Sequence, residues 1–93
     1  MKTIDSVEYN LNNKLMEMYD STGEIIGTFN PLKVIKESFE PKACYLISNM
    51  DDMVVFDKSG RDIMNIPIQE IVQVYTESKL EQKMYEKYLG NNN

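Results

Sequence analysis

The stretch KLMEMYDSTGEIIGTF, residues 14–29, decides the expected fold of this chain. In KLMEMYD, successive side chains fall on opposite faces of an extended chain, and both faces carry apolar residues. EIIGTF is rich in β-branched and aromatic residues, and Ser21-Thr22-Gly23 between the two halves provides a turn. The stretch therefore predicts an antiparallel hairpin, and Gly27 within its second strand predicts a bulge or a close backbone approach.

The segments on either side of this hairpin predict one more strand and a short helix. VEYNL at residues 7–11 alternates apolar with polar residues and leads into Asn12-Asn13, so it predicts a preceding strand. After residue 29 the period changes, because Asn30 suits an N-cap and Pro31 the first helical position. Apolar residues then follow at helical spacing: Leu32, Ile35 and Phe39. We therefore predict a helix at residues 31–39, ended by a proline.

The second half of the chain predicts another series of short strands. KACYLIS, MVVFD and RDIMNI, at residues 42–48, 53–57 and 61–66, are strand candidates separated by turn-forming residues. Pro67 cannot donate to a strand ladder, so we expect it at a strand end. EIVQVY, at residues 70–75, is expected to return as the last strand.

A helix is predicted at the C-terminus. Ser78 and Glu81 have the S-x-x-E spacing of a capping box, so we predict that the helix runs from about residue 79 to 89. One apolar stripe follows the i, i+4, i+8 positions: Leu80, Met84 and Tyr88. Gly90 suits the position after the helix end. We expect one globular domain over residues 1–90 and a frayed tail at 91–93.

These elements predict an α+β, β-rich fold: a small, strongly bent antiparallel sheet or barrel of six to seven short strands, with one inserted short helix and a C-terminal helix. MYDSTGEIIGTF resembles the opening hairpin of PRC-barrel domains, and IPIQEIVQVY is similar to their closing strand. A pleckstrin-like sheet capped by a C-terminal helix has the same pattern. Both resemblances imply an interaction scaffold.

The composition excludes several classes of function. The chain has 93 residues and a net charge of -5, with no histidine and a single cysteine, Cys44. It therefore cannot form a Ser-His-Asp or Cys-His catalytic arrangement, or a zinc site from its own cysteine and histidine ligands. We expect no enzyme activity, no cofactor and no metal. Because one cysteine forbids an internal disulfide and the N-terminus lacks an apolar leader, we predict a cytoplasmic protein without a membrane segment. Cys44 lies in an apolar run and is expected to be buried.

Charged groups give weaker indications. Asp51, Asp52, Asp57 and Asp62 crowd one predicted hairpin, but their spacing matches no known metal loop and favours a solvated turn. Glu17 and Glu24 are placed to face each other across the first hairpin. Lysines recur along the last helix, yet interleaved acidic residues dilute them, so direct nucleic-acid binding is not expected.

Methionine and tyrosine are in surplus, with seven and six copies. Both are enriched at protein interfaces because they offer large, adaptable contact area. The predicted interface consists of residues from the hairpin and the last helix: Met16, Met18, Leu80, Met84, Tyr85, Tyr88 and Leu89. The alternative is that the terminal helix covers Met16 and Met18 within one molecule.

From these observations we expect a small acidic protein-binding module without enzyme activity, which acts on a protein partner or on itself as a homo-oligomer. An accessory or inhibitory role, directed against a host or its defences and carried by a phage or mobile element, fits this description. Two alternatives remain open. One is a protein that binds or sequesters a small molecule or nucleotide, with tyrosine stacking on bases and lysine meeting phosphates. The other is an acidic nucleic-acid mimic that inhibits a nucleic-acid enzyme.

Overall fold

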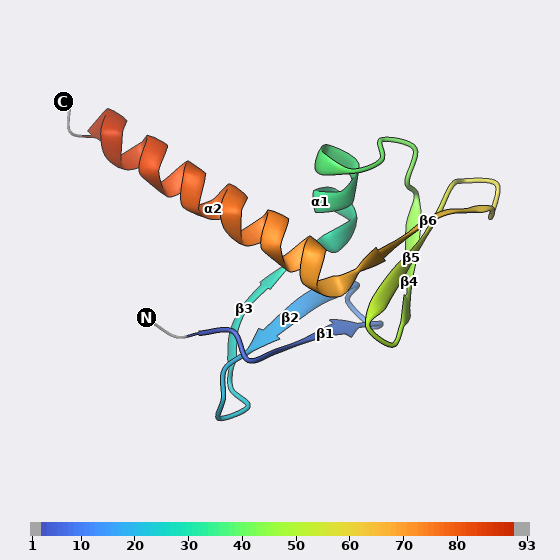
Figure 1. The fold of residues 1–93 in the computed structure, drawn as a ribbon, viewed down its shortest axis with the longest axis horizontal. Helices are drawn as coiled ribbons and strands as arrows, with labels where there is room; N and C mark the ends of the chain where they lie inside the picture. Colours follow the sequence, from blue (N-terminus) through green and yellow to red (C-terminus); the bar gives the residue numbers. More distant parts are fainter. Residues whose placement is uncertain (1–2, 91–93) are drawn as a thin grey trace.

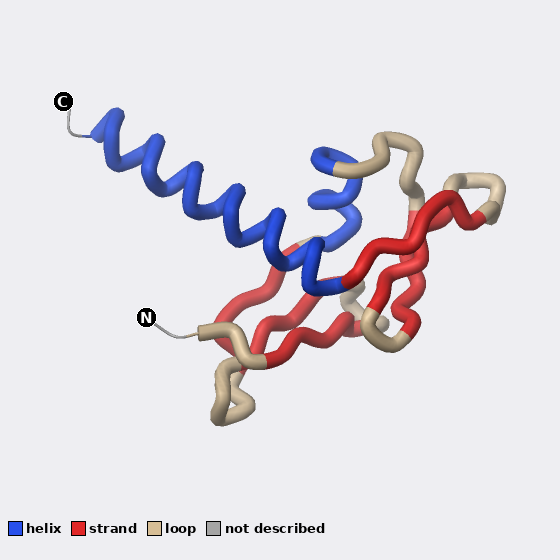
Figure 2. The backbone as a smooth tube through the Cα atoms, viewed as in Figure 1, coloured by secondary structure: helices blue, strands red, loops and turns tan. Residues whose placement is uncertain are grey.

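The computed structural model describes residues 3–90, with side chains as far as Met84. The predicted tail at 91–93 lies outside these residues. Figure 1 and Figure 2 show the path of the chain, a series of short strands interrupted by one helix and followed by a longer one. The elements in chain order are β1 (Ser6–Asn10), β2 (Leu15–Tyr19), β3 (Ile25–Phe29), α1 (Pro31–Ser38), β4 (Tyr45–Asn49), β5 (Asp52–Phe56), β6 (Asp62–Pro67) and α2 (Ile68–Gly90).

The strands form two separate antiparallel sheets rather than one bent sheet or a barrel. The first sheet has the order β1-β2-β3 and the second β4-β5-β6. The α+β, β-rich class is confirmed, but the barrel is wrong, and residues 3–90 contain six strands and no seventh. The physical reason is that α1 separates the two meanders and that residues 70–75, expected to be the closing strand, lie in α2.

The first helix follows its sequence prediction. The Asn30 side chain accepts hydrogen bonds from the backbone N–H groups of Leu32 and Lys33, at 3.0 and 3.4 Å. Pro31 occupies the first helical position, where its missing N–H costs nothing. Ile35 is fully buried, so α1 is held to the molecule by one apolar face.

The second helix corrects two predictions. Residues 70–75 are helical, not a strand, and α2 begins at Ile68, so Ser78 lies inside the helix and caps nothing. The same finding removes the closing strand on which the resemblance to PRC-barrel domains rested. β-branched residues favoured a strand, but buried or partly buried side chains recur here at helical spacing: Ile68, Ile71, Val72 and Tyr75. Two adjacent core residues, Ile71 and Val72, fit a helix better than a half-buried strand, whose neighbours point to opposite faces.

The two halves of the chain are structural repeats of one β-β-β-α unit, a symmetry that the sequence prediction missed. Each unit is a meander of three antiparallel strands followed by a helix. When Asp20 is aligned with Asp57, Met16 of β2 falls on Met53 of β5, and both are fully buried. In the same alignment α1 corresponds to residues 68–75 of α2. The remainder of α2, residues 76–90, therefore has no counterpart in the first unit.

Matching turns join the last two strands of each unit. In the second unit, Asp57 Oδ1 accepts hydrogen bonds from Ser59 N, Ser59 Oγ and Arg61 N, at 2.9, 2.6 and 3.1 Å. In the first unit, Asp20 accepts the same three bonds from Thr22 and Glu24, at 2.9, 2.6 and 3.0 Å. A glycine at positive φ follows in each turn, Gly23 at 86° and Gly60 at 88°. These turns fix the register of both hairpins.

The predicted irregularity at Gly27 is confirmed. Met18 pairs with Gly27 while the next residue, Tyr19, pairs with Ile25, so Ile26 is the extra residue of a bulge. A Cβ atom at Gly27 would lie 3.0 Å from the terminal methyl of Met18. Glycine therefore leaves room for this methionine inside the sheet.

One hydrophobic cluster joins both sheets and both helices. Its buried members are Met16, Met18, Phe29, Ile35, Ala43, Leu46, Met53, Val55, Ile66, Ile68, Ile71 and Val72. Cys44 departs from its prediction, because it is exposed next to the buried Ala43. Ala43 and Cys44 precede β4, and only within the strand do the side chains alternate, with Leu46 buried between the exposed Tyr45 and Ile47.

Candidate functional site

Beyond residue 75, helix α2 leaves the body of the molecule, and we call residues 76–90 the projecting segment (Figure 1). Residues 77–84 are all exposed. Leu80 exposes 61% of its surface and Met84 64%. Large apolar side chains at this exposure, four residues apart on one helix, form a short apolar stripe, which we call the exposed stripe.

The exposed stripe faces away from the core. Successive helix residues are separated by about 100° around the axis, so Leu80 and Met84 lie on the side opposite Ile71 and Tyr75, which pack on the body. The stripe is bordered by two charged flanks. Lys83 lies on one flank and Glu81 on the other, whereas Glu77, seven residues before Met84, falls in line with the stripe, and Lys79 lies over the Tyr75 ring on the other side of the helix.

The remaining residues of the predicted interface have different positions. Met16 and Met18 lie in the core, so this part of the prediction is wrong: the faces of β2 are both apolar, and the methionine face is turned inward. Met18 packs beside Gly27 of its own sheet. The other three predicted interface residues, Tyr85, Tyr88 and Leu89, lie beyond Met84, where side chains are not described. Leu80 and Met84 are the members of the predicted interface that the structure places on the surface.

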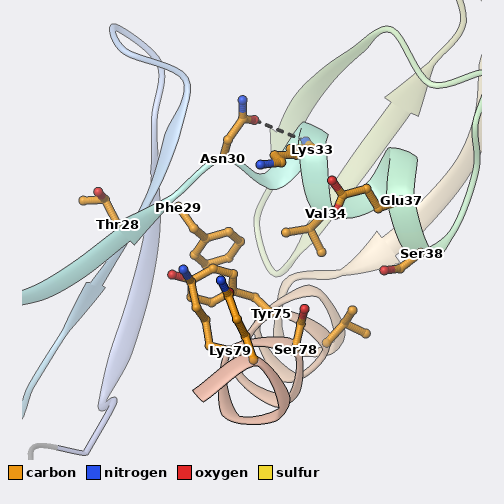
Figure 3. Close-up of a pocket in the computed structure, with 12 residues that line it drawn as sticks. Thr28, Phe29, Asn30, Lys33, Val34, Glu37, Ser38, Tyr75, Ser78 and Lys79 are labelled. Carbon is orange, nitrogen blue, oxygen red and sulfur yellow. Dashed lines mark hydrogen bonds between the residues drawn. The ribbon is translucent and has the colours of Figure 1, made fainter. Parts of the chain in front are cut away.

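A groove of about 370 Å³ lies between α1 and α2, at the base of the projecting segment (Figure 3). Phe29 of β3 and Tyr75 of α2 stack at one side of it, with ring centroids 4.1 Å apart and an angle of 10° between the planes. The ammonium group of Lys79 lies 5.9 Å from the centroid of the Tyr75 ring, within reach of a cation–π interaction. This pair of rings and the lysine connect the first sheet to α2.

The walls of the groove carry more positive than negative charge. Lys33 on α1 and Lys79 on α2 both border it, and Glu37 is the acidic residue among its lining side chains. Ser38 and Ser78 add hydroxyl groups, one from each helix. In a chain of net charge -5, such a location is the kind of place where a small anion can be held.

The repeat shows a difference between the outer faces of the two sheets. In the first sheet, Glu8 lies directly opposite Glu17. At the equivalent place in the second sheet, Ile47 lies opposite Val54, and Ile47 exposes 49% of its surface. Tyr45 and Phe56 stack beside this pair, with ring centroids 5.0 Å apart. The second sheet thus has an apolar outer face, which the sequence analysis did not identify because β5 is apolar at every position after Asp52.

The acidic side chains Glu17 and Asp57 form hydrogen bonds within the first sheet and within a turn, respectively. Glu17 pairs across the sheet with Glu8 and Thr28, so it does not face Glu24 as predicted. Tyr19 donates a hydrogen bond to Glu17 at 2.9 Å, and this bond is the main reason why the pKa of Tyr19 is raised above its usual value. The hydroxyl of Ser59, with help from backbone N–H groups, lowers the pKa of Asp57.

The Asp57 carboxylate thus accepts hydrogen bonds within its own turn. Among residues 3–84, no three side chains of the His, Cys, Asp or Glu type lie close enough together to hold a metal ion.

Comparison with known proteins finds no family model, no curated protein and no solved structure that matches this chain. Within the part of the chain that the structure describes, no helix is both long and apolar enough to cross a bilayer. The surfaces described above are therefore interpreted from their own chemistry.

Proposed function

We propose that this chain is a small protein-binding module without enzyme activity, and that it binds through the exposed stripe of α2. The observation that carries this proposal is the second half of α2. The eight residues that correspond to α1 complete the fold, whereas the projecting segment extends the helix with residues 77–84 all exposed.

Helix physics supports a contact role for the projecting segment. A helix is marginally stable in water unless an apolar face packs against something, because propensity alone contributes little. The stripe formed by Leu80 and Met84 is such a face, and a partner surface would bury it. An anti-host or anti-defence role for a phage or mobile element, and an acidic nucleic-acid mimic as its rival, remain predictions from composition.

The test compares three baits. The tagged chain, a Leu80→Glu/Met84→Glu variant and a Met50→Glu control are used to capture proteins from a lysate of the native host. Met50 exposes 89% of its surface in the β4–β5 turn, next to the start of α2 and not on the stripe, so its substitution adds a surface carboxylate outside the stripe, one where the double variant adds two. We expect a partner that the chain and the control retain equally and that the double variant loses, with the contact then reproduced using purified partner. Equal capture by all three baits, with unchanged circular dichroism, would refute binding through this stripe.

The groove between α1 and α2 favours a second candidate function, the capture of a small anion. Lys33 and Lys79 would neutralise a phosphate or carboxylate there. Thermal-shift measurements with nucleotides and inorganic phosphate test this, because a ligand at about 100 times its Kd stabilises a protein by roughly 2.7 kcal/mol. The shift should disappear in Lys33→Gln/Lys79→Gln and persist in Lys58→Gln, which alters an exposed turn lysine. If no compound shifts Tm, this candidate is wrong.

A further inference from the structure

We infer that the outer face of the second sheet is a docking surface for a basic amphipathic helix of another protein, one that presents an apolar stripe with lysine or arginine beside it. The strand register defines this face, strand by strand, as Tyr45, Ile47 and Asn49 of β4, Asp52, Val54 and Phe56 of β5, and Asp62 and Asn65 of β6. It is a different surface from the exposed stripe of α2, so the inference goes beyond the proposed function.

The centre of the outer face is apolar and open to solvent. Ile47 lies opposite Val54, and Tyr45 stacks on Phe56 with ring centroids 5.0 Å apart. Tyr45 and Ile47 are exposed, and Val54 and Phe56 are half-buried. An apolar sheet face is stabilised when a further element of structure covers it. A helix with an apolar stripe is one such element.

Carboxylates lie at both ends of this apolar centre. Asp52 lies in the row of Asn49, and Asp62 lies opposite Phe56, so the two acids are about 13 Å apart along the strand direction. Asp52 accepts a hydrogen bond from Asn65 at 3.4 Å, and Asp62 is exposed. Residues 51–62 contain four aspartates, one lysine and one arginine, which gives this hairpin a charge of -2. An apolar centre with a charged rim is the usual anatomy of a protein interface, and here the rim favours a cationic partner.

The internal repeat shows that the fold itself does not require this pattern. In the alignment of Asp20 with Asp57, the outer-face residues Asp52, Val54 and Asp62 fall on Leu15, Glu17 and Ile25. The first sheet therefore has an acidic centre and apolar ends, which is the reverse of the second sheet. Both sheets have the same strand order, the same register and a bulge at the same place. Backbone geometry thus does not account for the apolar centre of the second sheet, whereas a contact at this face does.

A hollow of about 430 Å³ on this face suits a long cationic side chain. Its lining combines the apolar side chains of Val54 and Ile63 with the Asp62 carboxylate and the amides of Asn49 and Asn65. A lysine or arginine of the partner can lay its aliphatic stem on the apolar part and bring its charged group to the carboxylate. A second copy of the chain is disfavoured here, because two such faces would bring like charges together.

A model peptide tests the inference. The probe is a fluorescein-labelled amphipathic helix of leucine and lysine, its counterpart is made of leucine and glutamate, and anisotropy gives the Kd for the full chain. We expect the lysine peptide to bind and the glutamate peptide not to bind. Asp52→Asn/Asp62→Asn should weaken binding about fivefold at low salt. Glu8→Gln/Glu17→Gln is the matched control, because it removes the same two charges from the first sheet and should leave the Kd unchanged. Equal weakening by both double variants would show attraction to net charge alone and overturn the inference.

Two further variants locate the peptide on the molecule. Ile47→Thr keeps a β-branched residue in the strand, so circular dichroism should not change, but it should weaken binding because the apolar centre is reduced. An unchanged Kd for this variant would overturn the inference. Leu80→Glu/Met84→Glu should bind the peptide as the wild-type chain does, and loss of binding would place the peptide on the exposed stripe instead. Failure at one surface is therefore distinguishable from failure at the other.

Sedimentation equilibrium examines the remaining occupant, a second copy. The wild-type chain should show no self-association through the outer face. A dimer that Ile47→Thr abolishes would show that the face pairs with itself and overturn the inference.

Discussion

Alanine substitutions along α2 should show that the helix has a packed half and a free half. Ile71 is completely buried, and replacing a buried isoleucine with alanine removes its transfer free energy and leaves a cavity, at a cost of about 3 kcal/mol. Leu80 is 61% exposed, so the same kind of truncation there should change the free energy of unfolding by less than about 0.5 kcal/mol. For a domain of this size, the loss at Ile71 lowers Tm by roughly 12–24 °C.

Urea denaturation followed by circular dichroism measures this contrast, and an unchanged m-value confirms that the same transition is compared. Val72→Ala provides the control for helical geometry, because Val72 is also buried and should lose more than about 1 kcal/mol. In a half-buried strand, only one of two adjacent residues would be costly to truncate. Equal effects at Ile71 and Leu80, or no effect at Val72, would refute the packing described here.

Three further measurements test the turns and the surface. Gly60→Ala should lower the free energy of unfolding by about 1 kcal/mol, because φ is 88° at this position. Gly27→Ala should lower it by less, because the added methyl meets only the flexible end of the Met18 side chain. Equal losses at the two glycines would contradict this. The lowered pKa of Asp57, caused first by the Ser59 hydroxyl, implies stability that is present above pH 4 and lost as the pH falls through the folded-state pKa. Acid titration of the wild-type chain and Asp57→Ala should therefore converge at low pH. Finally, the exposed Cys44 should react with Ellman's reagent in native buffer; protection until urea is added would show that it is buried.

Much of the fold was predictable because local chemistry determined it. The hairpin of β2 and β3, the bulge near Gly27 and the helix capped by Asn30 all follow from turn residues, periodicity and capping. Residues 70–75 were mispredicted because β-branched side chains favoured a strand, while the helical spacing continued from Ile68. The internal repeat was visible in YDSTG and FDKSG, but few other aligned residues are identical.

The candidate site was predictable in part. Leu80 and Met84 were predicted as interface residues of an apolar helical stripe; the structure exposes both, and their role in an interface stays a prediction. For β2, the sequence could not decide whether the face with Met16 and Met18 or the opposite face is buried, because both faces are apolar. The groove between α1 and α2 combines residues far apart in the sequence, and no local pattern indicates it.

The sequence by itself determined where strands, turns and the first helix form, because backbone conformation responds to neighbours within a few residues. Tertiary structure alone decided which face of β2 and β5 is buried and how far α2 is covered. Burial depends on the surfaces that surround a segment, and for a strand apolar on both sides these surfaces come from distant parts of the chain. Packing thus placed Met16 and Met53 inside while it left Leu80 and Met84 outside.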